Sequence, residues 1–320
     1  MTNDLSRNGL MGEWLFAGYH NLLIVETDPR SGNKSCGWSR DILMNDRVAR
    51  ARMTDARVKC LLVSLVFIVL ICGCHPGYRE DLDYSHNVQQ TWEVDGLENG
   101  VMVQFEDVFW EADDTISLRE LLTEGLIADG RDVLEIGTGT GLLSVLALRS
   151  NAKSVIATDI NPAAVANARY NAAMLAPENE IDVRQVSKES PGAFSVIGDN
   201  EKFDLILSNP PWEHGEVSEP IDHAFYDPEF ALMESLLDEL PLHLKPGGRC
   251  LLAYGHRPAV ELLIDACGKR GYEYVILDDR NLKDLDRDFL PGLLIEVVVP
   301  TRLLGKPLPI SNPPIEEISR

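Results

Sequence analysis

The residues Asn209, Pro210, Pro211 and Trp212 are four consecutive side chains whose types together suit the binding of a planar amino group. They follow the apolar run 203–208, so Asn209 is expected where a buried strand ends and a loop begins. The prolines fix φ and remove two backbone donors. The Asn209 side-chain oxygen and the Pro210 carbonyl could then each accept one N–H, while Trp212 stacks on the flat group. The alternative is a plain turn, because Asn and Pro are common turn residues.

A glycine-rich turn lies upstream, in the run Val-Leu-Glu-Ile-Gly-Thr-Gly-Thr-Gly-Leu over residues 133–142. Glycine permits the positive φ angles and close backbone approach that such a turn needs, and open parallel sheets bind ligands beyond the carboxyl ends of their strands. A dinucleotide fingerprint needs a small residue where Leu142 stands, so the spacing disfavours it. The candidate cofactor residues of this run are Glu135, Gly137, Thr138, Gly139 and Gly141.

Asp159 ends the next predicted strand, where its carboxylate could accept hydrogen bonds from two ribose hydroxyls. Each of these residues also has a purely structural alternative. Asp159 could be the N-cap of the following helix, and Glu135 could be a solvated residue at the end of a strand. Asn161 and Pro162 follow, and we expect them to begin a helix.

Alternating strands and helices that position these groups are predicted from about residue 101 onward, the signature of a parallel α/β sheet. We predict a doubly wound, seven-stranded, mostly parallel sheet of the Rossmann-like class. The predicted strands are Asp132–Ile136, Ser154–Asp159, Ile181–Val186, Phe203–Ser208, Arg249–Gly255, Tyr272–Leu277 and Leu293–Val299. The predicted helices are Leu142–Ser150, Pro162–Leu175, Pro228–Leu240 and Pro258–Arg270.

The charge is unevenly distributed along the 320 residues. Residues 1–73 carry nine Lys/Arg and seven Asp/Glu, so the remainder holds 29 − 9 = 20 Lys/Arg against 51 − 7 = 44 Asp/Glu and accounts for the negative formal charge of −22. An acidic surface repels phosphate backbones unless a basic cluster overrides it, and the sequence has no such cluster. Nucleic acid is therefore disfavoured as a partner, though not excluded. The six cysteines lack zinc-type spacing, and we expect no metal site, with Cys250 and Cys267 as buried apolar residues.

The first hundred residues divide into three predicted segments. Residues 1–52 have no sustained period, and we interpret them as poorly ordered and as an over-extended gene start, with translation beginning at Met53. Residues 53–74 pair a basic start with the apolar run 60–72, and this pattern is typical of a signal peptide or lipobox ending at Cys74. A spanning helix needs about 20 apolar residues, which is more than this run supplies. We expect 75–100 to be a linker, 101–300 a catalytic domain and 301–320 a Pro-rich tail.

These motifs, in this order, resemble the class I S-adenosylmethionine (SAM) methyltransferases. The pattern Glu-x-Gly-x-Gly-x-Gly over 135–141 is similar to their first motif, and Asp159 with Asn161-Pro162 is similar to the second. Asn-Pro-Pro-Trp resembles the Asn-Pro-Pro-Tyr of the "small domain" group, the HemK-type glutamine N5-methyltransferases and their N6-adenine relatives. Trp212 keeps the stacking face of that tyrosine and lacks its hydroxyl.

The resemblance implies SAM as cofactor and further contact residues. The segment 108–115 is similar to one that covers the cofactor in eukaryotic and archaeal members, which implies that Asp114 and Thr115 lie near SAM. The family usually has an acidic residue near the adenine after the third strand; here Ser187 is the positional candidate.

The implied activity is SAM-dependent methylation of an amide or amino nitrogen, with a Gln-like protein side chain as the favoured acceptor. The acidic loop after Trp212 suits a cationic or neutral substrate better than a phosphorylated one. The alternatives are a small-molecule or nucleic-acid (N6-adenine-type) methyltransferase and a degenerate SAM-binding envelope protein. We expect membrane association or export through 60–72 or Cys74, with a cytoplasmic enzyme as the alternative.

Overall fold

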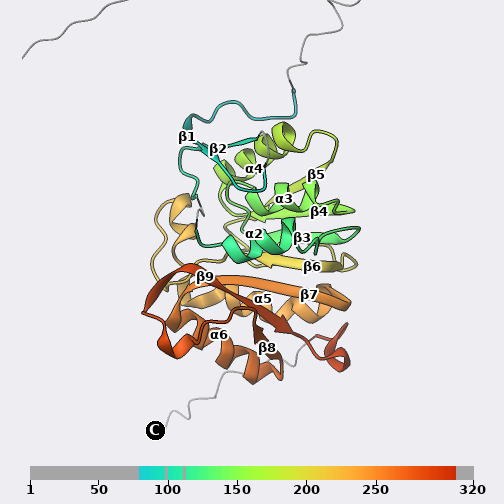
Figure 1. Cartoon of the computed structure of the whole chain (residues 1–320), viewed down its shortest axis with the longest axis vertical. Coiled ribbons are helices and arrows are strands. Elements are labelled where there is room, and N and C mark those ends of the chain that lie inside the picture. Colours follow the sequence, from blue (N-terminus) through green and yellow to red (C-terminus); the bar gives the residue numbers. More distant parts are fainter. Residues whose placement is uncertain (1–78, 98–99, 111–112, 308–320) are drawn as a thin grey trace, which may run out of the picture. The chain divides into compact units, whose positions relative to one another are not determined.

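The computed structural model describes residues 79–97, 100–110 and 113–307, and these build a sheet with helices on both faces (Figure 1). The predicted segments 1–52 and 53–74, and the tail beyond residue 307, lie outside the described residues. The seven-stranded sheet has the order β5-β4-β3-β6-β7-β9-β8, and β9 runs antiparallel to both of its neighbours. Its strands are β3 (Asp132–Ile136), β4 (Ser154–Asp159), β5 (Ile181–Gln185), β6 (Phe203–Ser208), β7 (Leu244–His256), β8 (Glu273–Ile276) and β9 (Asp288–Val298). The predicted doubly wound sheet is therefore confirmed.

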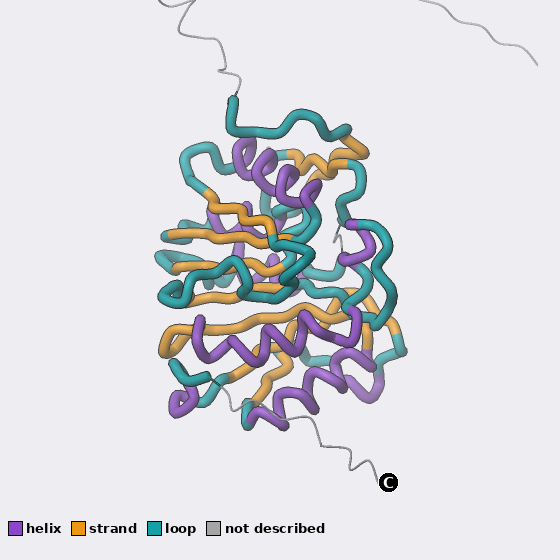
Figure 2. The backbone as a smooth tube through the Cα atoms, turned by 180° about the vertical axis from the view of Figure 1, so that it is seen from behind, coloured by secondary structure: helices purple, strands orange, loops and turns teal. Residues whose placement is uncertain are grey.

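Alternate residues of the central strands pack into two separate cores. Leu134 and Ile206 face the core formed with α5 (Ala231–His243) and α6 (Arg257–Arg270), whereas Val133 and Leu205 face the core formed with α2 (Ile116–Thr123) and α3 (Leu142–Arg149). The view from behind shows helices covering that face of the sheet and running roughly along its strands (Figure 2). The period of two along a strand sends neighbouring side chains to opposite faces, so a sheet covered on both faces needs apolar residues at almost every position.

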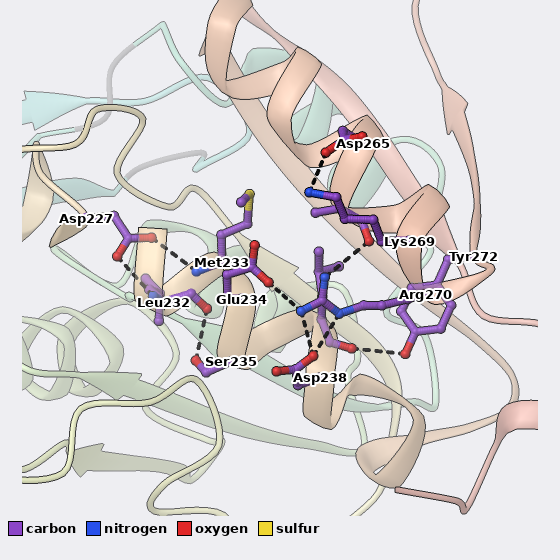
Figure 3. A network of polar contacts seen from close by, with 12 residues as sticks. Asp227, Leu232, Met233, Glu234, Ser235, Asp238, Asp265, Lys269, Arg270 and Tyr272 are labelled. Atoms are coloured by element: carbon purple, nitrogen blue, oxygen red, sulfur yellow. Dashed lines mark hydrogen bonds and ion pairs between the residues drawn. The ribbon is translucent and has the colours of Figure 1, made fainter. Parts of the chain in front are cut away.

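Three predicted element starts differ from the structure by several residues, and one of them is that of β9, which begins at Asp288 instead of Leu293. Strand β7 begins at Leu244 instead of Arg249, because Leu244 already pairs with Phe203 of β6. The residues 245–248 lie within β7, where its pairing with β6 shifts register. The predicted helix Pro228–Leu240 is a 3₁₀ turn, η3 (Pro228–Phe230), followed by α5. The break occurs because Glu229 and Phe230 have φ angles of 56° and 54°, and because the Asp227 carboxylate accepts the backbone N–H groups of Leu232 and Met233 at the start of α5 (Figure 3).

The predicted linker over 75–100 contains a strand. β1 (Val88–Glu93) pairs antiparallel with β2 (Val101–Phe105), and helix α2 follows the hairpin; the sequence interpretation missed both elements. β2 docks on α4 (Pro162–Leu175) through amide side chains instead of a further strand. Asn171 accepts the N–H of Val103 at 2.9 Å and donates to the carbonyls of Val103 and Thr140, both at 2.8 Å. These bonds tie the hairpin to the glycine turn.

The remaining short elements are the 3₁₀ turns η2 (Pro220–Ala224), η4 (Leu282–Asp284) and η5 (Thr301–Leu303). Cys250 and Cys267 are buried and unbridged, as predicted. Among the described residues, no helix has the length and apolar character needed to cross a membrane.

Candidate active site

The glycine turn joins β3 to α3 at the carboxyl edge of the sheet. Gly137, Gly139 and Gly141 have φ angles of 75°, 53° and 83°, as their residue type allows. A Cβ on Gly141 would lie 2.8 Å from the Cα of Ala168 in α4, so only glycine lets the two helices approach this closely. A Cβ on Gly137 would meet no atom within 4 Å. That open space belongs to a cavity which Gly137 and Gly139 line.

Glu135 lies beneath this turn and holds its shape. Its Oε2 accepts hydrogen bonds from the Thr138 hydroxyl at 2.8 Å and from the Ser144 N–H at 3.0 Å, and also from the Ser144 hydroxyl. The side chain is only 2% exposed. Burial raises the pKa of Glu135 to about 7, against the opposing effect of these donors. The sequence placed Glu135 and Thr138 among cofactor residues, and the structure places both in support of the loop that lines the cavity.

Asp159 ends β4 and lines the same cavity. Its two oxygens accept the N–H groups of Gly139 at 2.9 Å and Asn161 at 2.8 Å. Each carboxylate oxygen has a further lone pair, so the side chain can still accept from two ribose hydroxyls. Burial raises the pKa of Asp159, and the backbone donors oppose this. The alternative N-cap role belongs to Asn161, whose side chain accepts the Ala163 N–H at 3.0 Å.

Ser187, the positional candidate for the adenine contact, is not among the residues that line this cavity. Its side chain is exposed and bonds with Glu189, because the chain turns at this point and the Ser190 N–H bonds the Ser187 carbonyl. Val186, Pro191 and Gly192 line the cavity there. The wall at this position is therefore apolar and suits the face of a flat ring.

Asn209 and Pro210 lie at the end of β6, where they line both this cavity and a second one beside it. The Asn209 Nδ2 donates to Asp114 Oδ2 at 3.3 Å. Its Oδ1 is buried and has no hydrogen-bond partner among the described residues. A buried carbonyl oxygen without a donor is costly, so this atom is available to an incoming N–H group.

Trp212 lines the second cavity and is held against β7. Its Nε1 donates to the Ala253 carbonyl at 3.3 Å. A Cβ on Gly255 would lie 2.5 Å from the indole ring, so glycine is required for this close packing. The orientation of the ring is consequently set by the sheet, before any acceptor binds.

The second cavity combines aromatic and acidic walls. No Lys or Arg is among its described lining residues. Asp288 bonds the buried His256 Nδ1 at 2.5 Å, and ligand atoms of Glu213, His256 and Asp288 lie within 4.8 Å of one another. The aromatic lining residues are Phe109, Trp212, Phe225, Tyr226 and Phe289. Most of these residues carry no recognisable signal in the sequence, because they come from separate loops and from the start of β9.

The segment before α2 reaches both cavities. Phe109 lines both, whereas Asp114 lines the second cavity, on the side of Asn209 and Trp212. Thr115 is buried at the start of α2, with its hydroxyl lacking a partner among the described residues. Asp114 contacts Asn209 of the predicted acceptor motif and lines the second cavity, and it is not among the lining residues of the first.

Comparison with known proteins relates the chain to methyltransferases. The family profile of ribosomal protein L11 methyltransferase matches residues 115–210. The chain is 34% identical over 148 residues to an inferred protein N5-glutamine methyltransferase of Methanocaldococcus jannaschii, covering 44% of this chain and 69% of that protein. It is also 34% identical over 165 residues to a release factor glutamine methyltransferase of Cereibacter sphaeroides, covering 46% of this chain and 57% of that one.

A solved structure with a related arrangement is the 16S rRNA N2 G1207 methyltransferase from T. thermophilus, in complex with AdoMet and guanosine. Its TM-score is 0.45 at 18% identity, covering 65% of this chain and 50% of that one.

Three features together define a class I SAM-dependent methyltransferase. They are the strand order of the sheet, the glycine turn after β3, and the cavity that this turn and Asp159 line. The chain belongs to the same methyltransferase family as the archaeal relative, of which it spans 69%. SAM is its cofactor. The cavity lined by Gly137, Gly139 and Asp159 has the open space and the acceptor oxygens that SAM requires.

Proposed function

We propose that this enzyme methylates the amide nitrogen of a protein side chain, with glutamine as the favoured acceptor. The single observation that carries the proposal is the buried, unpartnered Oδ1 of Asn209 in the wall shared by two cavities of the described chain. A group entering from the second cavity with an N–H toward this oxygen would present its nitrogen at the boundary with the cofactor cavity.

The residues of the chain act by positioning and by electrostatic preorganisation. SAM supplies an electrophilic methyl group when bound. An amide nitrogen is delocalised and poorly nucleophilic. Asn209 Oδ1 and the Pro210 carbonyl would hold its two N–H groups, favour pyramidalisation and direct the lone pair toward the cofactor cavity. Trp212, fixed by Gly255, would stack on the planar group. The methylated nitrogen then releases one N–H proton to water, which is easy once the nitrogen carries the positive charge, so no strongly basic residue is needed for this step.

The names of the relatives support a nitrogen as the methyl acceptor, and they differ in the kind of molecule that carries this nitrogen. The archaeal and Cereibacter relatives are named for glutamine, and a Flavobacteriaceae relative, 32% identical over 117 residues, is named for adenine N6 of a tRNA. The acidic lining of the second cavity favours a protein over a nucleic acid, because a phosphate would meet the carboxylates that line it. An adenine or a small amine is the second candidate, since Asn209 can accept from any planar amino group.

Replacing Asn209 by Ala is the direct test of the acceptor site. We expect SAM affinity to stay within about threefold of wild type, while methyl transfer falls by at least ~100-fold, the scale of one lost preorganised group. The assay uses labelled SAM with a lysate separated into protein, nucleic acid and small molecules, and calorimetry reports SAM binding. Label in protein supports the proposal, and label in nucleic acid or small molecules selects the second candidate. Wild-type turnover by the variant would refute the role of Asn209, and absence of SAM binding by wild type would favour a degenerate protein.

We also propose attachment of the enzyme to a membrane through residues 60–72 or a lipidated Cys74. The support is the basic start and apolar run in the sequence, both outside the described residues. Fractionation of the native protein beside a Cys74→Ser variant tests it. Recovery of wild type in the soluble fraction would contradict the proposal.

A further inference from the structure

We propose that Asp114 is a positioning residue that sets the orientation of the Asn209 side-chain amide, so that Oδ1 and not Nδ2 is offered to the acceptor. This inference rests on the proposed function, because it explains why the Asn209 side chain offers its oxygen, and not its nitrogen, to the methyl acceptor. The contact joins residues far apart in the sequence, Asn209 Nδ2 donating to Asp114 Oδ2 at 3.3 Å.

With Asp114 ionised, the chemistry of the pair permits one arrangement only. An ionised carboxylate accepts hydrogen bonds and donates none. The Asn209 amide must therefore turn its nitrogen toward Asp114, which leaves Oδ1 as the free end among the described residues. An amide rotated by half a turn would place Oδ1 against the carboxylate. It would also present two donors to an acceptor that itself brings N–H groups.

The backbone around Asp114 is fixed by tight packing. A Cβ on Gly292 of β9 would lie 2.5 Å from the Asp114 carbonyl oxygen, so the two backbones are in direct contact. The next residue, Thr115, is 1% exposed at the start of α2. Asp114 is consequently held between a helix start and a strand, and its carboxylate has a defined place relative to Asn209.

Gly255 of the neighbouring strand β7 has a role similar to that of Gly292. Gly255 admits Trp212 as Gly292 admits Asp114, and both lie where the β7–β9 ladder shifts register between Tyr254 and His256. One irregularity of the sheet thus places both the stacking ring and the carboxylate that orients the amide. The family resemblance implied that Asp114 lies near SAM, whereas its contacts give it a role toward the acceptor.

Exchanging the two side chains separates orientation from mere structural support. Asp114→Asn allows either amide orientation at position 209, and we expect methyl transfer to fall by about 10- to 100-fold with SAM affinity unchanged. Asn209→Asp places two carboxylates together, and we expect a similar or larger loss.

The double variant, which combines Asp114→Asn with Asn209→Asp, restores the contact with its donor and acceptor exchanged. The amide now at position 114 would donate to one oxygen of the carboxylate at position 209 and leave the other oxygen free. Turnover should therefore recover at least tenfold over the poorer single variant. A double variant no better than that single variant would overturn the proposal.

A second measurement decides the contact without turnover. The Nδ2 proton signals of Asn209, assigned in ¹⁵N spectra by their loss in Asn209→Ala, should exchange with water more slowly in wild type than in Asp114→Asn. Asp113→Asn, which alters the exposed neighbouring carboxylate, is the matched control and should leave the exchange rate unchanged. Equal exchange in wild type and Asp114→Asn would refute the inference. Slow exchange in an enzyme that methylates no amide would support the inference and refute the proposed function.

Discussion

At Asn209 the two ends of one side-chain amide have different surroundings, and this difference carries the chemistry. The nitrogen bonds Asp114, and the oxygen is buried without a partner among the described residues. In the glycine turn, too, different residues line the cavity and support the loop. Gly137 and Gly139 line the cavity, while Glu135 beneath them receives the donors of Thr138 and Ser144 and holds the loop in shape.

Glu135 should make the stability of the enzyme depend on pH. Its folded-state pKa of about 7 lies above the ordinary value of 4.5, so protonation favours the folded state. That stability is fully present below about pH 4.5 and is lost as the pH rises to about 7, by on the order of 3 kcal/mol. Urea denaturation of the SAM-free protein at several pH values should show this loss in wild type and its absence in Glu135→Gln. Parallel curves for the two proteins would contradict the prediction.

At the scale of elements, the β1–β2 hairpin is held by the amides of α4 instead of by a sheet. The Asn167 and Asn171 side chains, both fully buried, satisfy backbone groups of β2. The hairpin also carries Trp92, which stacks on Trp110 with ring centroids 5.0 Å apart. The sequence interpretation treated 75–100 as a linker because β1 shows no alternation of apolar and polar residues, its side chains being almost all exposed.

Replacing Asn171 by Ala should loosen this hairpin. The change removes the Asn171 partner of the Val103 N–H and of the Thr140 carbonyl, while Asn167 still donates to the Val103 carbonyl. We expect a loss of about 3 kcal/mol in the free energy of unfolding. The Trp92–Trp110 signal in near-ultraviolet circular dichroism should weaken with it. Met174→Ala, at a half-exposed position of the same helix, is the matched control and should cost less than about 0.5 kcal/mol. Equal stability of the two variants would show that the amide bonds do not hold the hairpin.

At the scale of the whole molecule, the acidity of the chain is concentrated in the part that holds the site. The formal charge is −22, and Asp114, Glu213 and Asp288 line the second cavity, whose described lining residues include no Lys or Arg. Charge of one sign in a concave site raises the encounter rate with ligands of the opposite sign. The cofactor cavity, by contrast, has mostly apolar walls around Asp159.

Acceptor peptides should therefore be selected by charge. At low ionic strength we expect a glutamine peptide flanked by lysines to react with kcat/KM about tenfold higher than the same peptide flanked by glutamates. The ratio should fall toward one as salt is added, because exposed charges are screened within about 10 Å at 0.1 M salt. A peptide flanked by alanines is the control and should lie between the two. A ratio that favours glutamate flanks, or that ignores salt, would contradict the prediction.

The sequence by itself determined the alternation of strands and helices, the glycine turn, Asp159 and the Asn209–Trp212 loop. These features depend on local period, turn chemistry and residues close together in the chain, and the bounds of β3, β4, β6 and α4 agree with their prediction. The break before α5 could not be predicted in this way, because Glu229 and Phe230 adopt positive φ angles only in the folded context of Asp227.

Only the tertiary structure decided which way the Asn209 amide faces and what surrounds the acceptor. Ser187, chosen by its position after the third strand, turns outward to Glu189, whereas Asp114 reaches Asn209 because Gly292 lets its backbone approach β9. Asp288 and Phe289 join the same wall from the far end of the chain. These contacts connect segments that no local pattern links, since they depend on how the strands pair and where the backbones touch.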